Sequence, residues 1–269
     1  MSTTMKFRNS CVVCALLLPA GAACADSPFD GNLALTSDYM FRGLSQTWGK
    51  PALQGGVDYN SGRFHAGAWT SNVSRNSYPG GGVELDVFTD AALWQRGDWN
   101  MRAGLYAYLY PGANLDHARP ALPSRSLDTL EANASLQWKH WTLKYSRALG
   151  DYFGADVQQG YARDTGGTDY LQLEGDIPLS SRWNLHLHAG RTHYTSKLLA
   201  PLPDGAVNPD YADYSLVAAY IFSPHCSLAA TLSHATNDAF YLRVTSFTDP
   251  SAQKNLAGTR AVLSLSTTF

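Results

Sequence analysis

Charged residues are scarce in this sequence, and long apolar runs are missing. Asp, Glu, Lys and Arg make up 16% of the 269 residues, whereas a soluble domain usually carries about 25%. No run approaches the roughly 18 apolar residues that a membrane-spanning helix needs. A basic excess is also missing, because 20 Lys and Arg stand against 22 Asp and Glu, for a net charge of -2. The composition argues against a nucleic-acid partner, and any part of the chain that lies in a membrane must cross it as strands.

Cysteine is nearly missing from the part of the chain that we expect to be mature. Two basic residues precede an apolar stretch at residues 11–18 and small residues up to Ala25, which predicts a signal peptide at residues 1–25. Its removal changes the charge balance from 20 minus 22 to 18 minus 22, or -4, and leaves Cys226 as the only cysteine. An internal disulfide is then excluded. A lipoprotein signal acylated at Cys24 is the weaker alternative, because glycine stands three residues earlier, where such signals usually carry leucine.

Alternation of apolar and polar residues is the dominant pattern after residue 31. Val83, Leu85 and Val87, for example, alternate with Glu84 and Asp86. Segments of about ten such residues have the length that a tilted strand needs to cross a bilayer. We therefore predict an all-β fold, a transmembrane antiparallel up-and-down β-barrel of about 12 strands, as one domain over residues 26–269. The expected strands are residues 32–42, 51–59, 63–72, 83–94, 98–110, 127–138, 140–149, 168–178, 182–194, 211–222, 225–236 and 259–269.

The connections between these strands alternate in length. The short ones are residues 60–62, 95–97, 139–140, 180–181 and 223–224, and the long ones are 43–50, 73–82, 111–126, 150–167, 195–210 and 237–258. Short periplasmic turns and long outer loops are typical of outer-membrane barrels. With the amino end in the periplasm, every long connection lies outside the cell. The last one contains a strand-like stretch, which we interpret as a hairpin above the membrane rather than a register shift of the last two strands.

Aromatic residues stand at positions that suit a membrane interface and a barrel end. Trp94, Trp99, Trp138 and Trp141 flank short turns, where amphipathic rings mark the inner interface. Phe269 is the last residue of an alternating strand, the signal that barrel-assembly machinery recognises in proteins of this class. Because an unpaired backbone group is costly in hydrocarbon, we expect the first and last strands to pair and close the barrel.

Two parts of the chain resemble the TorF-type porin family of proteobacteria. They are the opening NLALTSDYMFRGLSQT at residues 32–47 followed by QGGVDY at 54–59, and the final TRAVLSLSTTF at 259–269. Between them the resemblance extends only as a general pattern, and the long 237–258 segment departs from it. The resemblance implies an outer-membrane barrel that is classed as a porin by its architecture, without an assigned substrate.

Parity places a set of charged residues on the inner face of the predicted barrel. Eight of them are acidic and four are basic, which as a hypothesis biases a water-filled pore toward cations. An alternative is that these charges pair in ladders that stabilise the wall and conduct nothing. The expected inward residues are Asp38, Arg42, Asp58, Glu84, Asp86, Asp90, Arg102, Glu131, Lys144, Glu174, Asp176 and Arg260.

The sequence thus favours a porin-like channel for passive passage of small hydrophilic solutes or ions. Its expected partners are outer-membrane lipid and lipopolysaccharide, the barrel-assembly machinery and small solutes, with no nucleic acid; the oligomeric state stays open. A non-conducting surface, adhesion or structural barrel is the main alternative. A lipolytic barrel enzyme is a weaker one, because His234 lies near the outer rim without a serine placed beside it. We expect no cofactor and no metal, since His186 and His188 could chelate but lack a third ligand.

Overall fold

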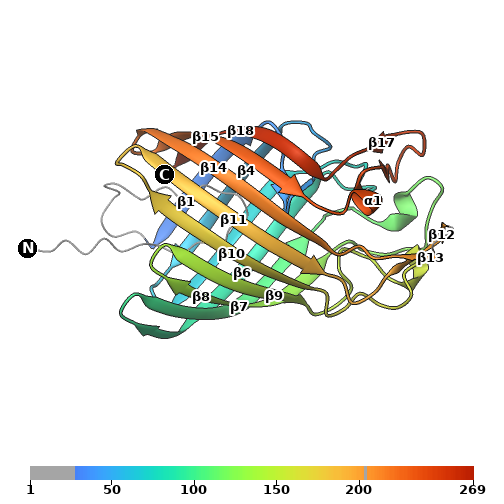
Figure 1. Cartoon of the computed structure of the whole chain (residues 1–269), viewed down its shortest axis with the longest axis horizontal. Coiled ribbons are helices and arrows are strands. Elements are labelled where there is room, and N and C mark those ends of the chain that lie inside the picture. The colour runs from blue at the N-terminus through green and yellow to red at the C-terminus, as the bar shows by residue number, and fades with distance from the viewer. Residues whose placement is uncertain (1–27, 203–204) are drawn as a thin grey trace, which may run out of the picture.

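A closed ring of antiparallel strands forms the body of the protein. The computed structural model describes residues 28–202 and 205–269, and within these residues the ring has the order β1-β18-β15-β14-β11-β10-β9-β8-β7-β6-β5-β4 (Figure 1). β1 pairs with both β4 and β18, so the barrel has no free edge. The barrel strands are β1 (Phe29–Thr36), β4 (Ala52–Asn60), β5 (Phe64–Asn72), β6 (Val83–Arg96), β7 (Trp99–Leu109), β8 (Thr129–Trp138), β9 (Trp141–Ala148), β10 (Asp169–Pro178), β11 (Trp183–His193), β14 (Tyr211–Ser223), β15 (Cys226–Ala235) and β18 (Gly258–Thr268).

The predicted twelve-stranded antiparallel barrel is confirmed, with one error in the strand bounds. Most strands begin and end within a few residues of the expected positions, but β1 ends at Thr36 and not at residue 42. Leu33 and Leu35 point outward and are 46% and 55% exposed, whereas Tyr39, which alternation along the expected strand 32–42 puts on the same face, is 1% exposed. The alternating pattern continues past Thr36 in the sequence, but the chain there leaves the wall and turns inward.

Aliphatic side chains cover the outside of the barrel. Exposed leucines and valines occupy the outward positions of successive strands, for example Leu105, Leu143 and Leu173. Most exposed aromatic residues lie at the short-turn end, and they are Phe29, Tyr59, Phe64, Trp94, Trp99, Trp138, Trp141, Trp183, Phe222 and Phe269; Tyr145 and Tyr214 are exposed farther from the short turns. An aliphatic band bordered by an aromatic girdle is the outer surface of a transmembrane barrel. No helix in the described part of the chain is long and apolar enough to cross a membrane.

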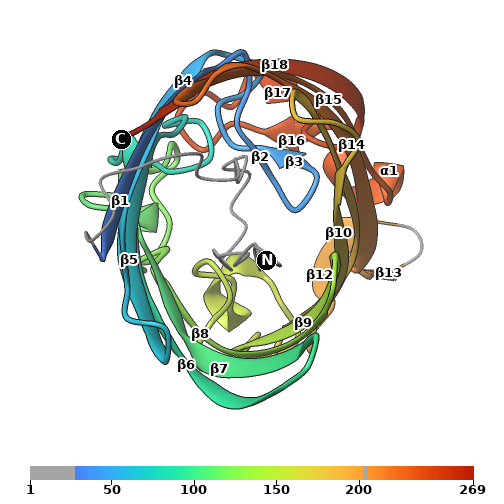
Figure 2. The same cartoon turned by 90° about the vertical axis from the view of Figure 1, so that its left-hand side faces the viewer.

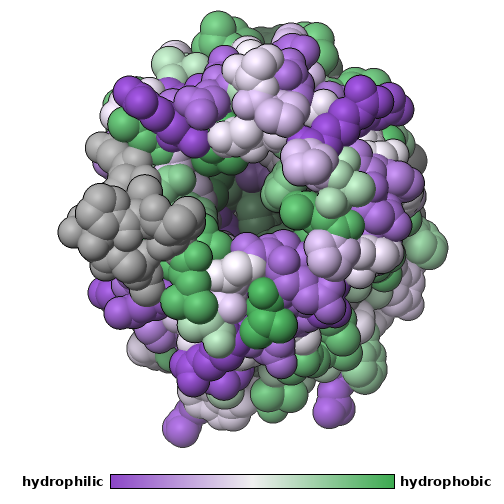
Figure 3. All heavy atoms as spheres, turned by 90° about the vertical axis from the view of Figure 1, so that its right-hand side faces the viewer, coloured by the Kyte–Doolittle hydropathy of each residue, from purple (hydrophilic) through white to green (hydrophobic). Residues whose placement is uncertain are grey.

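All long connections gather at the opposite end of the barrel, as their lengths predicted (Figure 1). Seen from that end, the molecule is hollowed at its centre (Figure 3). The elements in these connections are β2 (Met40–Phe41), β3 (Leu44–Ser45), η1 (Leu115–His117), η2 (Val157–Gln159), β12 (Leu198–Leu202), β13 (Gly205–Val207), α1 (Asp238–Tyr241), β16 (Val244–Thr245) and β17 (Gln253–Lys254).

The long segment at residues 237–258 forms a hairpin, as we favoured from the sequence. β16 pairs with β17, while β15 and β18 keep a continuous register from Cys226↔Thr267 to Ala235↔Gly258. The register-shift alternative is therefore wrong. The hairpin joins neighbouring loops, because the amide of Phe247 donates to the carbonyl of Asn76 at 2.8 Å and the carbonyl of Phe247 accepts from the amide of Arg119 at 2.6 Å.

Candidate functional site in the barrel interior

The first long connection turns into the barrel, where β2 and β3 form an inward hairpin (residues 37–49). Its tip is Arg42 and Gly43, with φ of 47° and 74°, and two successive positive φ values are typical of a type I′ turn. Viewed along the barrel axis, β2 and β3 lie inside the ring (Figure 2). A side chain at Gly43 would begin 2.6 Å from Cβ of Asp213 on β14. The tip therefore lies directly against the inner wall.

Arg42 fastens the tip of the inward hairpin to β8. Its two Nη atoms donate to the two carboxylate oxygens of Glu131 at 2.9 and 2.8 Å, and Nη1 also donates to the hydroxyl of Tyr152 at 2.7 Å. The guanidinium lies 4.1 Å from the ring centre of Tyr170. Burial opposes the charge of Arg42, but the Glu131 carboxylate outweighs it, so the pKa of Arg42 is raised. This buried, bidentate ion pair holds the hairpin across the interior.

Asp38 organises the base of the inward hairpin. Its Oδ1 accepts hydrogen bonds from the hydroxyls of Ser45 and Thr47, both at 2.7 Å. Its Oδ2 lies 3.8 Å from Nη1 of Arg260 on β18. The amide of Tyr39 donates to Thr47 Oγ1 at 3.1 Å, which closes the base. The inward hairpin is thus held in place by polar contacts both at its tip and at its base.

Glu84 and Asp86 on β6 form a buried acidic pair beside the inward hairpin. The hydroxyl of Tyr39 donates to Glu84 Oε1 at 3.2 Å, and that of Tyr106 donates to Asp86 Oδ2 at 2.8 Å. The other oxygens, Glu84 Oε2 and Asp86 Oδ1, accept no hydrogen bond from the described residues. Among the described residues, each arginine that forms an ion pair does so with a carboxylate other than Glu84 or Asp86. The pair has no basic partner among the described residues.

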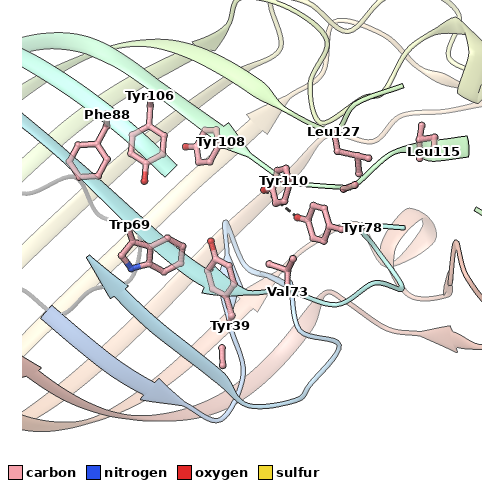
Figure 4. Close-up of a cluster of buried hydrophobic side chains, with 12 residues drawn as sticks. Tyr39, Trp69, Val73, Tyr78, Phe88, Tyr106, Tyr108, Tyr110, Leu115 and Leu127 are labelled. Atoms are coloured by element: carbon pink, nitrogen blue, oxygen red, sulfur yellow. Dashed lines mark hydrogen bonds between the residues drawn. The ribbon is translucent and has the colours of Figure 1, made fainter. Parts of the chain in front are cut away.

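A cluster of buried side chains, most of them aromatic, includes Tyr39 and Tyr106, the two tyrosines that donate to this acidic pair (Figure 4). The rings of Tyr78 and Tyr110 stack with centres 4.2 Å apart, and Tyr39 lies 5.4 Å from Trp69. Burial first, and then the charge of Glu84, raises the pKa of Tyr39 and of Tyr78, so both hydroxyls stay protonated and able to donate. On β5 and β7, Trp69, Tyr106 and Tyr108 point inward and are buried. The cluster consists of Tyr39, Ala52, Trp69, Val73, Tyr78, Phe88, Tyr106, Tyr108, Tyr110, Ala113, Leu115 and Leu127.

A second charged network lies toward the short-turn end of the interior. His65 Nδ1 is 2.9 Å from Asp90 and its Nε2 is 3.0 Å from Asp58. Arg102 Nε also donates to Asp90. Each acid of this network faces a basic or imidazole group, which suits the ladder that we expected as the alternative to a solute path.

The histidines of β11 face carboxylates on the neighbouring strands. His186 Nδ1 lies 2.8 Å from Asp176, and His188 lies 2.7 Å from Asp213 and 3.5 Å from Glu174. In the part of the chain that the structure describes, no group of three His, Cys, Asp or Glu side chains has a geometry suited to a metal ion. Both histidines lie within contact distance of carboxylates of the wall.

The structure brings the expected inward residues into several separate groups. The groups are Arg42 with Glu131, Asp38 near Arg260, Glu84 with Asp86, Arg102 with Asp58 and Asp90, Glu174 and Asp176 with the β11 histidines, and Lys144 with its Nζ 5.7 Å from the ring centre of Tyr106. Sequence reasoning missed His65, Tyr152 and Asp213, and it missed the hairpin that crosses the interior. Only the tyrosines at positions 106, 108 and 110 carried a usable signal, because their period of two puts them on one face.

A closed barrel with an aliphatic exterior and a charged interior defines the porin-like class of folds. The chain belongs to the family described as "Bacterial protein of unknown function (Gcw_chp)", whose model matches residues 22–269. A search of curated proteins found no match. The family places the chain among bacterial proteins and assigns it no activity.

Solved structures of porins share the fold of this chain. A KdgM porin in complex with disordered oligogalacturonate has a TM-score of 0.50 at 6% identity, over 90% of this chain and 98% of that chain. A NanC porin has a TM-score of 0.47 at 9% identity, over 89% and 98%. The TodX monoaromatic hydrocarbon channel has a TM-score of 0.44 at 13% identity, over 91% of each chain. At 6% identity, the likeness to the KdgM porin shows a shared fold and nothing more.

Proposed function

We propose that this protein is a TorF-type porin of the outer membrane, through which small hydrophilic solutes or ions pass by diffusion. The observation that carries the proposal is the closed ring with leucine and valine outside and charged side chains inside. Such a ring meets lipid with its outer face and can hold water within. The hollow at the centre of the loop end supports a passage (Figure 3), and the inward hairpin would be its constriction.

A preference for cations is the finer part of this proposal. Its support is the contrast between paired and unpaired charges: Arg42 and Arg102 bond carboxylates, whereas Glu84 and Asp86 have no basic partner among the described residues. Field lines from an uncompensated pair focus in a low-dielectric wall. The interior would therefore attract cations and repel anions.

Export and assembly complete the proposal. The expected signal peptide at residues 1–25 lies outside the described residues. The girdle of exposed aromatics at the short turns suits the periplasmic interface. Phe269 exchanges backbone hydrogen bonds with Gly31, at 2.8 and 3.0 Å, so the residue that we expect the barrel-assembly machinery to recognise also takes part in closure. Lipopolysaccharide and other outer-membrane lipids would then surround the aliphatic band.

A non-conducting structural barrel is the second candidate. It is favoured by the buried Arg42–Glu131 ion pair and by the aromatic cluster, which fill part of the interior. The lipolytic alternative gains no support, since the contact of His234 Nδ1 is with Thr259 Oγ1 at 3.0 Å. The residues directly opposite His234 on the neighbouring strands are Tyr214 and Thr259.

Single-channel recording separates the two candidates. Residues 26–269 would be refolded in detergent and inserted into a planar bilayer, with a solute series added to find what blocks the current. Discrete conductance steps with a reversal potential on the cation side are expected for the proposed porin. A correctly folded barrel that inserts but carries no current would favour the structural barrel, and an anion-side reversal potential would refute the cation preference.

A further inference from the structure

Two arginines interrupt the aliphatic outer wall near the loop end. Arg147 on β9 is exposed between the buried Ser146 and Ala148, and Arg191 on β11 is exposed between buried neighbours as well. Because successive strand residues point to opposite faces, both arginines project outward. Both stand within the last three residues of strands that run toward the long loops. Their guanidinium groups thus lie on the lipid-facing side, at the level of the loop-end membrane interface.

The register of β9, β10 and β11 gathers these arginines on one patch. Asp169 on β10 pairs with Arg147 on one side and with His193 on the other, and Leu171 pairs with Arg191. Residues directly opposite on neighbouring strands have Cβ atoms about 5 Å apart. The two arginines therefore flank the same short stretch of β10, within reach of one ligand. We call Arg147, Arg191 and His193 the outer basic patch.

The charges of the outer basic patch are poorly compensated. His193 Nδ1 lies 2.8 Å from Asp210, but neither Arg147 nor Arg191 has a carboxylate within 4.0 Å among the described residues. Asp169 is the one acid that the register puts between them. In the described barrel strands, no other outward-facing arginine or lysine lies away from the short turns. Two arginines without an ion pair on an aliphatic wall suit an anionic partner.

Space for the rest of such a partner lies beside the patch. Leu149, two residues beyond Arg147, lines an open hollow of about 720 Å³ together with Leu109 and Leu130 of the outer wall. The loop side of this hollow is polar and includes Ser124 and Arg125 together with the carboxylates of Asp128 and Asp151. An aliphatic floor under a polar edge suits a molecule with acyl chains and a hydrophilic head.

We propose that the outer basic patch binds the phosphate groups of a phosphorylated glycolipid in the outer leaflet. Arginine is suited to phosphate because its planar fork donates two parallel hydrogen bonds. The aliphatic wall below the patch would take the acyl chains, and the hollow beside it would take part of the saccharide. This inference rests on the proposed outer-membrane location, and it does not depend on whether the barrel conducts.

Lipopolysaccharide binding to the refolded full-length mature protein in detergent, followed by native mass spectrometry, tests the proposal. The test variant is Arg147→Ser with Arg191→Ser, and the matched control is Arg96→Ser with Arg182→Ser, two exposed arginines at short turns. At about 1 kcal/mol for each basic residue near a lipid headgroup, the test variant should bind about 30-fold more weakly. The control variant should bind like the wild type.

Two further probes keep the outcome independent of any single variant. Lipopolysaccharide stripped of its phosphates should bind the wild type as weakly as intact lipopolysaccharide binds the test variant. Inorganic phosphate at millimolar concentration should not displace the lipid. Equal binding of the intact and stripped lipids, equal binding by wild type and test variant, or displacement by free phosphate would each overturn the proposal. This experiment measures binding and not conductance, so its outcome does not depend on whether the barrel is a channel.

Discussion

Removal of Arg42 should release the inward hairpin from the wall. The Arg42→Ala change leaves Glu131, which is 2% exposed, without its bidentate partner. Loss of one member of a buried ion pair costs about 3–5 kcal/mol, which corresponds to roughly a 150-fold to 5,000-fold change in the docking equilibrium. The contacts of Asp38 at the base of the hairpin are untouched. The hairpin tip should therefore detach while the barrel stays closed.

Two measurements report this release. In single-channel recordings, Arg42→Ala should show larger and noisier steps than the wild type, because the constriction becomes mobile. In a Cys226→Ser background, a cysteine introduced by Leu44→Cys should react faster with a maleimide once Arg42 is also replaced. Leu44 suits this use because it is partly buried against the cluster that contains Tyr211.

Matched variants separate the ion pair from side-chain size. Arg42→Lys keeps one charge but loses the second hydrogen bond, so it should lie between the wild type and Arg42→Ala. The double change Arg42→Ala with Glu131→Ala leaves no buried charge and should recover part of the docking. Unchanged conductance together with unchanged maleimide reactivity in Arg42→Ala would refute the view that this pair holds the hairpin.

Further outcomes follow from other parts of the barrel. Glu84→Gln with Asp86→Asn should lower the cation-to-anion permeability ratio by up to about fivefold for each carboxylate; a reversal potential in a KCl gradient measures this, and no shift would contradict the role of the pair. Trp69→Ala should lower the free energy of unfolding in urea by about 3–5 kcal/mol, whereas the exposed control Trp99→Ala should change it little. A loss below about 1 kcal/mol for Trp69→Ala would speak against the packed cluster. Leu173→Arg, on the outward face, should destabilise the protein by about 2–4 kcal/mol in lipid vesicles, whereas an equal stability of variant and wild type there would mean that this face does not meet lipid.

The wall of the barrel was predictable because alternation repeats within each strand. Val83 to Val87 carry their exposure pattern in their own residue types, and the outward leucines follow from the same period. The error at β1 has a tertiary cause. Tyr39 and Phe41 continue the local alternation, but Asp38 binds Ser45 and Thr47, and Arg42 reaches a glutamate 89 residues away. No local pattern contains that distant partner.

The inward face was predictable as a set, but its pairings were not. Alternation alone places Asp90 and Arg102 among the inward polar positions. That the two side chains are neighbours follows only from the register of β6 and β7. His65 was missed because a single histidine between Phe64 and Ala66 gives no period of its own. Its bridge between Asp58 and Asp90 exists only when β4, β5 and β6 stand side by side.

The pairing of β1 with β18 also sets the order in which the molecule can be completed. Thr36 and Ser264, whose hydroxyls meet across this join at 2.9 Å, are 228 residues apart in the chain. Because β1 is made first and β18 last, the backbone groups of β1 that face β18 stay unpaired until nearly all the other strands have been made. Until that pairing forms, the sheet is open and the backbone groups along the facing edges of β1 and β18 are unpaired. A partner must cover these unpaired strand edges, because hydrocarbon cannot form hydrogen bonds with the backbone.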